Sequence, residues 1–94
     1  LAYAGKDRSA LSAPVLALNG ADDPFIKPAE VDAFEQEMRE RKADWQLVKY
    51  SGAVHAFTQP MAGNDNSKGA AYNAVADKRS WRAMKDFLAE RFGR

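Results

Sequence analysis

The chain has 94 residues, of which 46% are apolar and 29% are charged, the composition expected of a soluble globular chain with one domain at most. Fourteen Lys and Arg against thirteen Asp and Glu give a net charge of +1, which argues against nucleic acid or an anionic membrane as a partner. No apolar run approaches the roughly 18 residues that span a bilayer. With no cysteine and one histidine, the chain cannot form a disulfide, a thiolate metal site or a multi-histidine metal site, and we expect no cofactor.

The first predicted strand follows a small, polar lead-in loop at residues 1–12. Residues 14–20 read Pro-Val-Leu-Ala-Leu-Asn-Gly, a continuous apolar run closed by Asn-Gly. Such a run predicts a strand buried on both faces, as in a parallel sheet. Residues 20–24, Gly-Ala-Asp-Asp-Pro, have the composition of a turn, so we expect the strand to end in an exposed loop.

A helix is predicted over residues 28–42, because Pro28 suits the first helical turn and basic residues gather at the other end. An apolar stripe recurs at helical spacing, formed by Val31, Phe34 and Met38. Two pairs one turn apart, Glu35–Arg39 and Glu37–Arg41, are expected to form ion pairs on a solvated helix face.

Residues 44–50 are rich in aromatic and β-branched side chains and predict a second strand, which makes a βαβ unit with a parallel strand pair. A long loop is expected over 51–69 and a final helix over 70–92. The buried side of that helix is predicted to consist of Tyr72, Val75, Ala76, Ser80, Ala83, Met84, Phe87 and Leu88, with Trp81 beside it.

Two strands and two helices do not complete an α/β domain, because a fully apolar strand needs strand neighbours on both edges and helices on both faces. The sequence also begins at Leu1 and not at Met. We therefore expect it to be the C-terminal βαβα part of a larger, doubly wound, mostly parallel sheet. If the 94 residues were the whole polypeptide, we would expect homo-oligomers formed by edge-to-edge pairing or by strand swapping.

Two polar residues follow the two predicted strands, namely Asp23 and His55. Functional groups in open α/β sheets lie beyond the carboxyl ends of the strands, so adjacent parallel strands would bring these residues together. A carboxylate bonded to one ring nitrogen fixes the tautomer that a catalytic histidine needs. The plainer interpretation is a surface histidine and an ordinary Asp-Asp-Pro turn. Asp22 is the second candidate for the acid, but side chains of neighbouring residues in an extended loop point apart, so only one acid should face the histidine.

The site is flanked by Phe25, Ile26 and Phe57, which would shield the pair from water or pack in the core.

These residues also carry a resemblance to a known family. Residues 14–25 resemble the acid-bearing strand and turn of the dienelactone hydrolase family, within the α/β-hydrolases, and residues 52–58 (Gly-Ala-Val-His-Ala-Phe-Thr) are similar to its histidine loop. Residues 72–77 and 79–88 resemble its final helix, so the likeness covers most of residues 13–92. The resemblance implies that residues 1–94 are the C-terminal part of one α/β-hydrolase domain.

The resemblance further implies that Asp23 orients His55, that His55 acts as general base and then general acid, and that the substrate is a small ester or lactone. The family's nucleophile, a Cys or a Ser between two glycines after an earlier strand, is absent from this sequence, and so are its oxyanion-hole amides. None of the serines has that context: Ser9, Ser12, Ser51, Ser67 and Ser80. We therefore predict that the 94 residues alone do not hydrolyse esters. The alternative is a non-catalytic, self-associating or interaction module built on the same half-fold.

Overall fold

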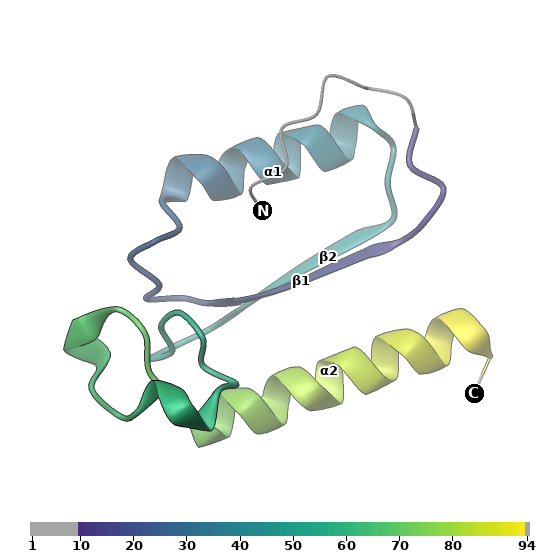
Figure 1. The fold of residues 1–94 in the computed structure, drawn as a ribbon. Coiled ribbons are helices and arrows are strands. Elements are labelled where there is room, and N and C mark those ends of the chain that lie inside the picture. Colours follow the sequence, from purple (N-terminus) through teal and green to yellow (C-terminus); the bar gives the residue numbers. More distant parts are fainter. Residues whose placement is uncertain (1–9, 94) are drawn as a thin grey trace.

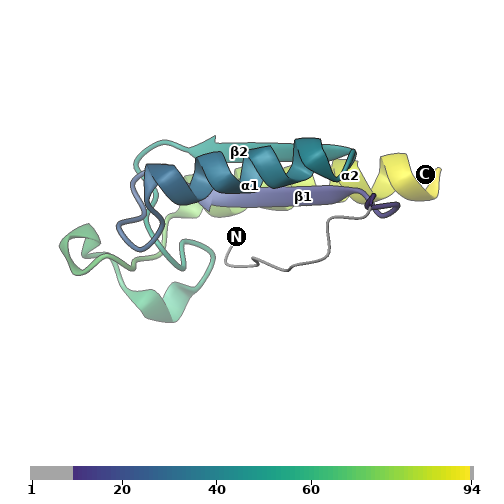
Figure 2. The ribbon, with the colours of Figure 1, turned by 90° about the horizontal axis from the view of Figure 1, so that it is seen from above.

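The computed structural model describes residues 10–93, so most of the predicted lead-in loop lies outside the described residues. The elements in chain order are β1 (Val15–Gly20), α1 (Pro28–Glu40), β2 (Trp45–Tyr50), the short 3-10 helices η1 (Pro60–Ala62) and η2 (Asn66–Lys68), and α2 (Ala74–Phe92). Figure 1 shows three layers, with α1 on one face of the two strands and α2 on the other. The same layering is seen from above in Figure 2. The predicted β-α-β-α order and α/β class are confirmed.

Strands β1 and β2 are parallel and pair in register from Val15 opposite Trp45 to Gly20 opposite Tyr50. The βαβ unit predicted from the sequence is therefore present. Because side chains alternate along a strand, paired residues share a face of the sheet. Leu18, Val48 and Tyr50 lie on the α2 face, where the buried core also contains Ala53, Phe57 and Ala76.

Helix α1 forms as its stripe predicts, with Val31 and Met38 buried and the Phe34 ring edge-on to Trp45 at 6.1 Å. It ends at Glu40, two residues earlier than expected. Lys42 adopts a φ of +53°, the Lys42 N–H bonds to the Arg39 carbonyl, and the next N–H, that of Ala43, bonds to the Met38 carbonyl. This is the hydrogen-bond pattern of a Schellman helix end, here with a lysine in the left-handed position.

The two predicted ion pairs of α1 are both present, but only one lies on a solvated face. Arg39 and Glu35 are 3.4 Å apart, and Arg39 also lies over the Trp45 ring. Arg41 and Glu37 are 3.1 Å apart and both are buried. The expectation of a solvated face is wrong for this second pair. It lies at the end of α1 where the segment leading into β1 passes, since the Leu11 N–H bonds to the Arg41 carbonyl.

Strand β1 is half-buried from Val15 to Asn19, so the prediction of full burial on both faces is not met within residues 10–93. The physical reason is the sheet itself, which contains two strands in the described part of the chain. One edge of β1 therefore has no strand beside it there.

The segment before α2 departs from the predicted helix start. Residues 70–73 are not helical, and the Asn73 side chain accepts the Ala76 N–H as the cap of a helix that begins at Ala74. Ala76 and Ser80 are buried, as predicted. Val75 is 57% exposed and Leu88 43%, so the placement of these two residues on the buried side is wrong; Trp81 is as exposed as Val75.

Candidate active site

The carboxyl group of Asp23 is held by the turn that follows β1. The Asp23 N–H bonds to the carbonyl of Gly20 at the strand end, and Oδ1 accepts the Phe25 N–H at 2.8 Å. The side chain is only 5% exposed. A buried carboxylate is stable when it accepts hydrogen bonds, and the Phe25 amide supplies one of them.

His55 follows β2 and is fixed by its backbone on both sides. Its N–H bonds to the Gly69 carbonyl and its own carbonyl accepts the Ala71 N–H, each at 3.1 Å, in a short parallel bridge. Ala56 then takes a φ of +59°, an unfavourable angle for a residue with a side chain. Such strain often occurs at functional sites, where the surrounding structure imposes it.

Asp23 and His55 are 32 positions apart in the sequence, but their side chains meet in the fold: His55 Nδ1 lies 3.0 Å from Asp23 Oδ2. The histidine side chain is 54% exposed, and within residues 10–93 no hydrogen-bond partner lies at its other nitrogen, Nε2. The pair thus combines a buried carboxylate with an imidazole whose far nitrogen is open. That arrangement suits proton transfer at Nε2.

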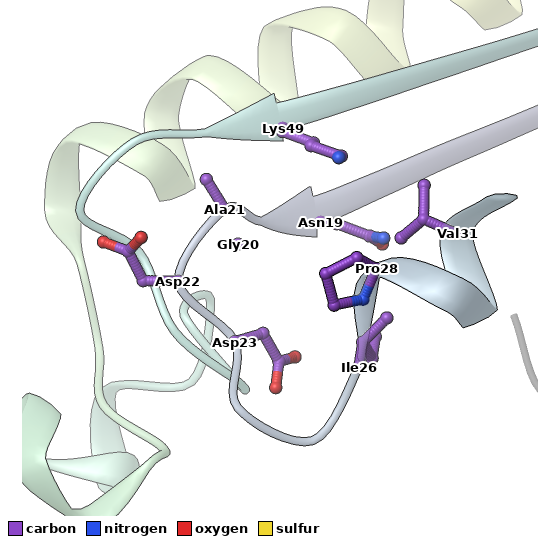
Figure 3. Close-up of a pocket in the computed structure, with 9 residues that line it drawn as sticks. All are labelled: Asn19, Gly20, Ala21, Asp22, Asp23, Ile26, Pro28, Val31 and Lys49. Carbon is purple, nitrogen blue, oxygen red and sulfur yellow. The ribbon is translucent and has the colours of Figure 1, made fainter.

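Asp22 is not brought to the histidine. Figure 3 shows the Asp22 and Asp23 carboxyl groups pointing in different directions around a hollow of about 250 Å³, which both residues line. Asp22 is exposed, whereas Asp23 is buried. The carboxylate that is hydrogen-bonded to His55 is that of Asp23.

The three flanking apolar residues have different roles. The Phe25 ring lies edge-on to the His55 ring, with centroids 5.3 Å apart and an interplanar angle of 84°. Ile26 lines the hollow beside Asp23. Phe57 packs in the core, tilted against Tyr50 at 5.7 Å. Of these three residues, Phe25 is therefore the one whose ring packs against the histidine ring.

The long loop after His55 is tied back to its start, which sequence reasoning missed. The side-chain amides of Asn66 and Asn73 both donate to the Gly52 carbonyl, at 3.1 and 3.3 Å. The Asn73 N–H bonds to the Phe57 carbonyl. Asparagines in this loop were the available signal, because Asn commonly bonds backbone groups in turns and at helix starts.

The local surroundings raise the pKa of two tyrosines near this loop above the ordinary value. Burial raises the pKa of Tyr50, an effect that the positive charge of Arg79 partly offsets. The hydrogen bond from the Tyr72 hydroxyl to Asp77 Oδ2, at 2.7 Å, raises the pKa of Tyr72, with burial and the Asp77 charge acting in the same direction.

Within residues 10–93, no three side chains of metal-binding type gather in one place. Over the same residues, no helix is both long and apolar enough to cross a membrane.

Comparison with known proteins identifies the family. Parallel strands with a helix on each face define an α/β fold, and the fold matches solved hydrolases of dienelactone hydrolase type. The model of the dienelactone hydrolase family matches residues 4–92. The chain therefore belongs to the dienelactone hydrolase family, as the sequence resemblance indicated.

Individual relatives agree with this assignment. An uncharacterized Caenorhabditis elegans protein is 39% identical over 79% of this chain, and the match covers 47% of the relative. A Saccharolobus solfataricus protein, provisionally named a carboxymethylenebutenolidase, is 32% identical over 83% of this chain and 27% of its own length. The crystal structure of a dienelactone hydrolase-like promiscuous phosphotriesterase from metagenomic libraries superposes with a TM-score of 0.78 and 42% identity, over 84% of this chain and 33% of that one. The chain thus spans half or less of the length of these proteins.

Proposed function

We propose that this chain supplies the acid and the histidine of a hydrolase that cleaves carboxylic esters or lactones, with the nucleophile on a segment outside this sequence. The observation that carries the proposal is the 3.0 Å contact between the buried carboxylate of Asp23 and Nδ1 of the open His55 ring. Membership of the dienelactone hydrolase family supports the class of reaction.

In the proposed reaction, the Nε2 lone pair of His55 takes the proton of a Ser or Cys nucleophile as that group bonds to the carbonyl carbon. The proton then passes from Nε2 to the leaving alkoxide as the scissile C–O bond breaks. In the second half, Nε2 takes a proton from water, which attacks the acyl-enzyme, and returns it to the nucleophile. Asp23 keeps its negative charge throughout and stabilises the imidazolium.

The decisive experiment measures ester and lactone hydrolysis by the full-length protein with Asp23→Asn and His55→Ala. We expect kcat to fall by about 10³- to 10⁴-fold for Asp23→Asn, since an amide no longer fixes the productive tautomer. Asp22→Asn is the matched control, because it removes the same charge from the neighbouring exposed position and should retain nearly all activity. A larger loss from Asp22→Asn than from Asp23→Asn would transfer the role to Asp22, and full activity of His55→Ala would refute the proposal.

The second candidate is a non-catalytic, self-associating module, which the unpaired edge of β1 within the described residues favours. Expression of the 94 residues alone separates the two. We expect no hydrolysis of an activated aryl ester, because within residues 10–93 no serine hydroxyl bonds to His55. Ester hydrolysis by this polypeptide that disappears with His55→Ala would contradict that expectation. Dimers in sedimentation analysis, together with an inactive full-length protein, would favour the module.

The substrate class has one further test. One structural relative is described as a promiscuous phosphotriesterase. A phosphotriester should therefore be assayed beside the carboxylic esters, since the same proton transfers serve attack on phosphorus. We expect the ester or lactone to be the better substrate by kcat/KM.

A further inference from the structure

The loop that follows His55 returns to the site at Gly69, where it passes directly beneath the acid-bearing turn. Gly69 is buried and has a φ of +86°, in the left-handed region. A Cβ atom on this residue would lie 3.1 Å from Cζ of Phe25 and 3.1 Å from Cγ of Pro24. These separations are shorter than normal carbon–carbon contacts, so with a side chain at position 69 the Phe25 and Pro24 rings of the acid-bearing turn would have to move by a few tenths of an ångström.

Gly69 also touches the histidine, because its carbonyl accepts the His55 N–H at 3.1 Å. Gly69 therefore bonds to His55 directly and lies against Pro24 and Phe25 of the turn that carries Asp23. On the acid side the link runs through Phe25, whose N–H holds Asp23 Oδ1 and whose ring lies against the imidazole.

From these contacts we propose that Gly69 is a positioning residue, whose missing side chain sets the separation between the Asp23 carboxylate and the His55 imidazole. The inference rests on the proposed function and deepens it, because it names how the loop after the histidine tunes that pair. The proposal requires that the Phe25 and Pro24 rings pass this displacement on to the Phe25 amide, which holds the Asp23 carboxylate, while His55 stays bonded to the Gly69 backbone.

The alternative is that Gly69 matters only for its backbone angle. Gly93 provides the matched control, since it is also left-handed, with a φ of +71°, and nothing lies within 4 Å of a Cβ built on it. The cost of the left-handed angle for a residue with a side chain is common to both positions. Only Gly69→Ala adds the contact with the acid-bearing turn.

The experiment compares Gly69→Ala with Gly93→Ala in the full-length protein. We expect Gly69→Ala to lower kcat by about tenfold with KM unchanged, because the loss concerns the geometry of proton transfer and not substrate binding. Gly93→Ala should retain the parent kcat. Equal kcat losses in the two variants would overturn the proposal, as would an unchanged kcat in Gly69→Ala.

A second readout does not depend on activity. The proton between His55 Nδ1 and Asp23 gives a downfield proton NMR signal when the bond excludes water. We expect this signal to broaden or vanish in Gly69→Ala and to persist in Gly93→Ala. If the His55→Ala assay refutes the proposed function, this signal still tests the positioning role, so the two failures are distinguishable. An unchanged signal in Gly69→Ala would overturn the role.

A double variant covers the case in which Gly69→Ala folds poorly. If the added methyl group acts through the Phe25 ring, the same substitution in a Phe25→Ala background should cost only about threefold in kcat, since residues in contact are not additive. An equal cost in both backgrounds would show that the Phe25 ring does not transmit the effect.

Discussion

The two ends of this molecule differ in how well the described residues cover their apolar side chains. At the carboxyl ends of the strands, the loops pack closely, and Ala53 and Ala71 are fully buried. Along α2, by contrast, Trp81 is 57% exposed, Leu88 43% and Phe92 72%. The comparison teaches that the loops around Asp23 and His55 are held by contacts inside this chain, whereas α2 has apolar side chains that the described residues leave uncovered.

The largest effect is expected at the well-packed end, from Gly20→Ala. A Cβ on Gly20 would lie 2.5 Å from the Ala53 carbonyl oxygen and 2.7 Å from that of Val54, which are rigid backbone atoms. The substitution must push the histidine loop away from the end of β1. We expect a loss of about 4 kcal/mol or more in the free energy of unfolding, in the range that marks severe core disruption.

Urea unfolding of the full-length protein measures this loss. Gly52→Ala is the control, because Gly52 has a φ of +73° with open space around it and should cost only about 1–2 kcal/mol. Equal losses for the two variants would mean that the strand end and the histidine loop are not rigidly joined, and the contrast between the two ends would weaken.

The second-largest effect is expected at the exposed apolar side chains of α2. Trp81, Leu88 and Phe92 recur at helical spacing, and the chain covers only 33% of the phosphotriesterase structure that it matches. We expect further chain to cover this stripe in the full-length protein. Trp81→Ala should then cost about 3 kcal/mol in the free energy of unfolding.

Val75→Ala is the control for this experiment, because Val75 is as exposed as Trp81 but lies outside the stripe on α2. We expect it to change the free energy of unfolding by no more than about 0.5 kcal/mol, as at ordinary surface positions. If Trp81→Ala lowers the free energy of unfolding as little as Val75→Ala does, the stripe is open to solvent in the full-length protein. The two ends would then differ less in how well they are covered than we infer.

The sequence predicted the well-packed end in part, and the reasons are local. Pro28 with the Val31–Met38 stripe was enough to predict α1, and the apolar run before Gly20 was enough to predict β1. Strand order then placed Asp23 and His55 at one edge of the sheet. The start of α2 was missed because residues 70–73 contain no Gly or Pro to break a helix.

Other features depend on contacts between distant residues and leave no local signal. Gly69 lies 44 positions after Phe25 in sequence (69 minus 25), and only the folded loop brings them together. The segment before β1 likewise meets the end of α1, beside the buried Glu37–Arg41 pair, only in the folded chain. Periodicity identifies which faces are apolar, but it does not identify what covers them.

The smallest effect concerns the junction between the two ends, where Tyr72 bonds to Asp77 at the start of α2. This bond raises the pKa of Tyr72 in the folded protein above its ordinary value of 10.0. A raised folded pKa stabilises the protein fully below pH 10, and this stabilisation is lost as the pH rises through the folded pKa. Asp77→Ala should therefore lower the pKa of Tyr72 and flatten the pH dependence of stability above pH 10. Carbon NMR titration of the tyrosine rings measures the pKa, and urea unfolding at several pH values above 10 measures the stability. Tyr50 is the control for the titration, because burial and not Asp77 raises the pKa of Tyr50. A pKa of Tyr72 that does not move in Asp77→Ala would mean that the hydrogen bond does not hold the start of α2 in solution.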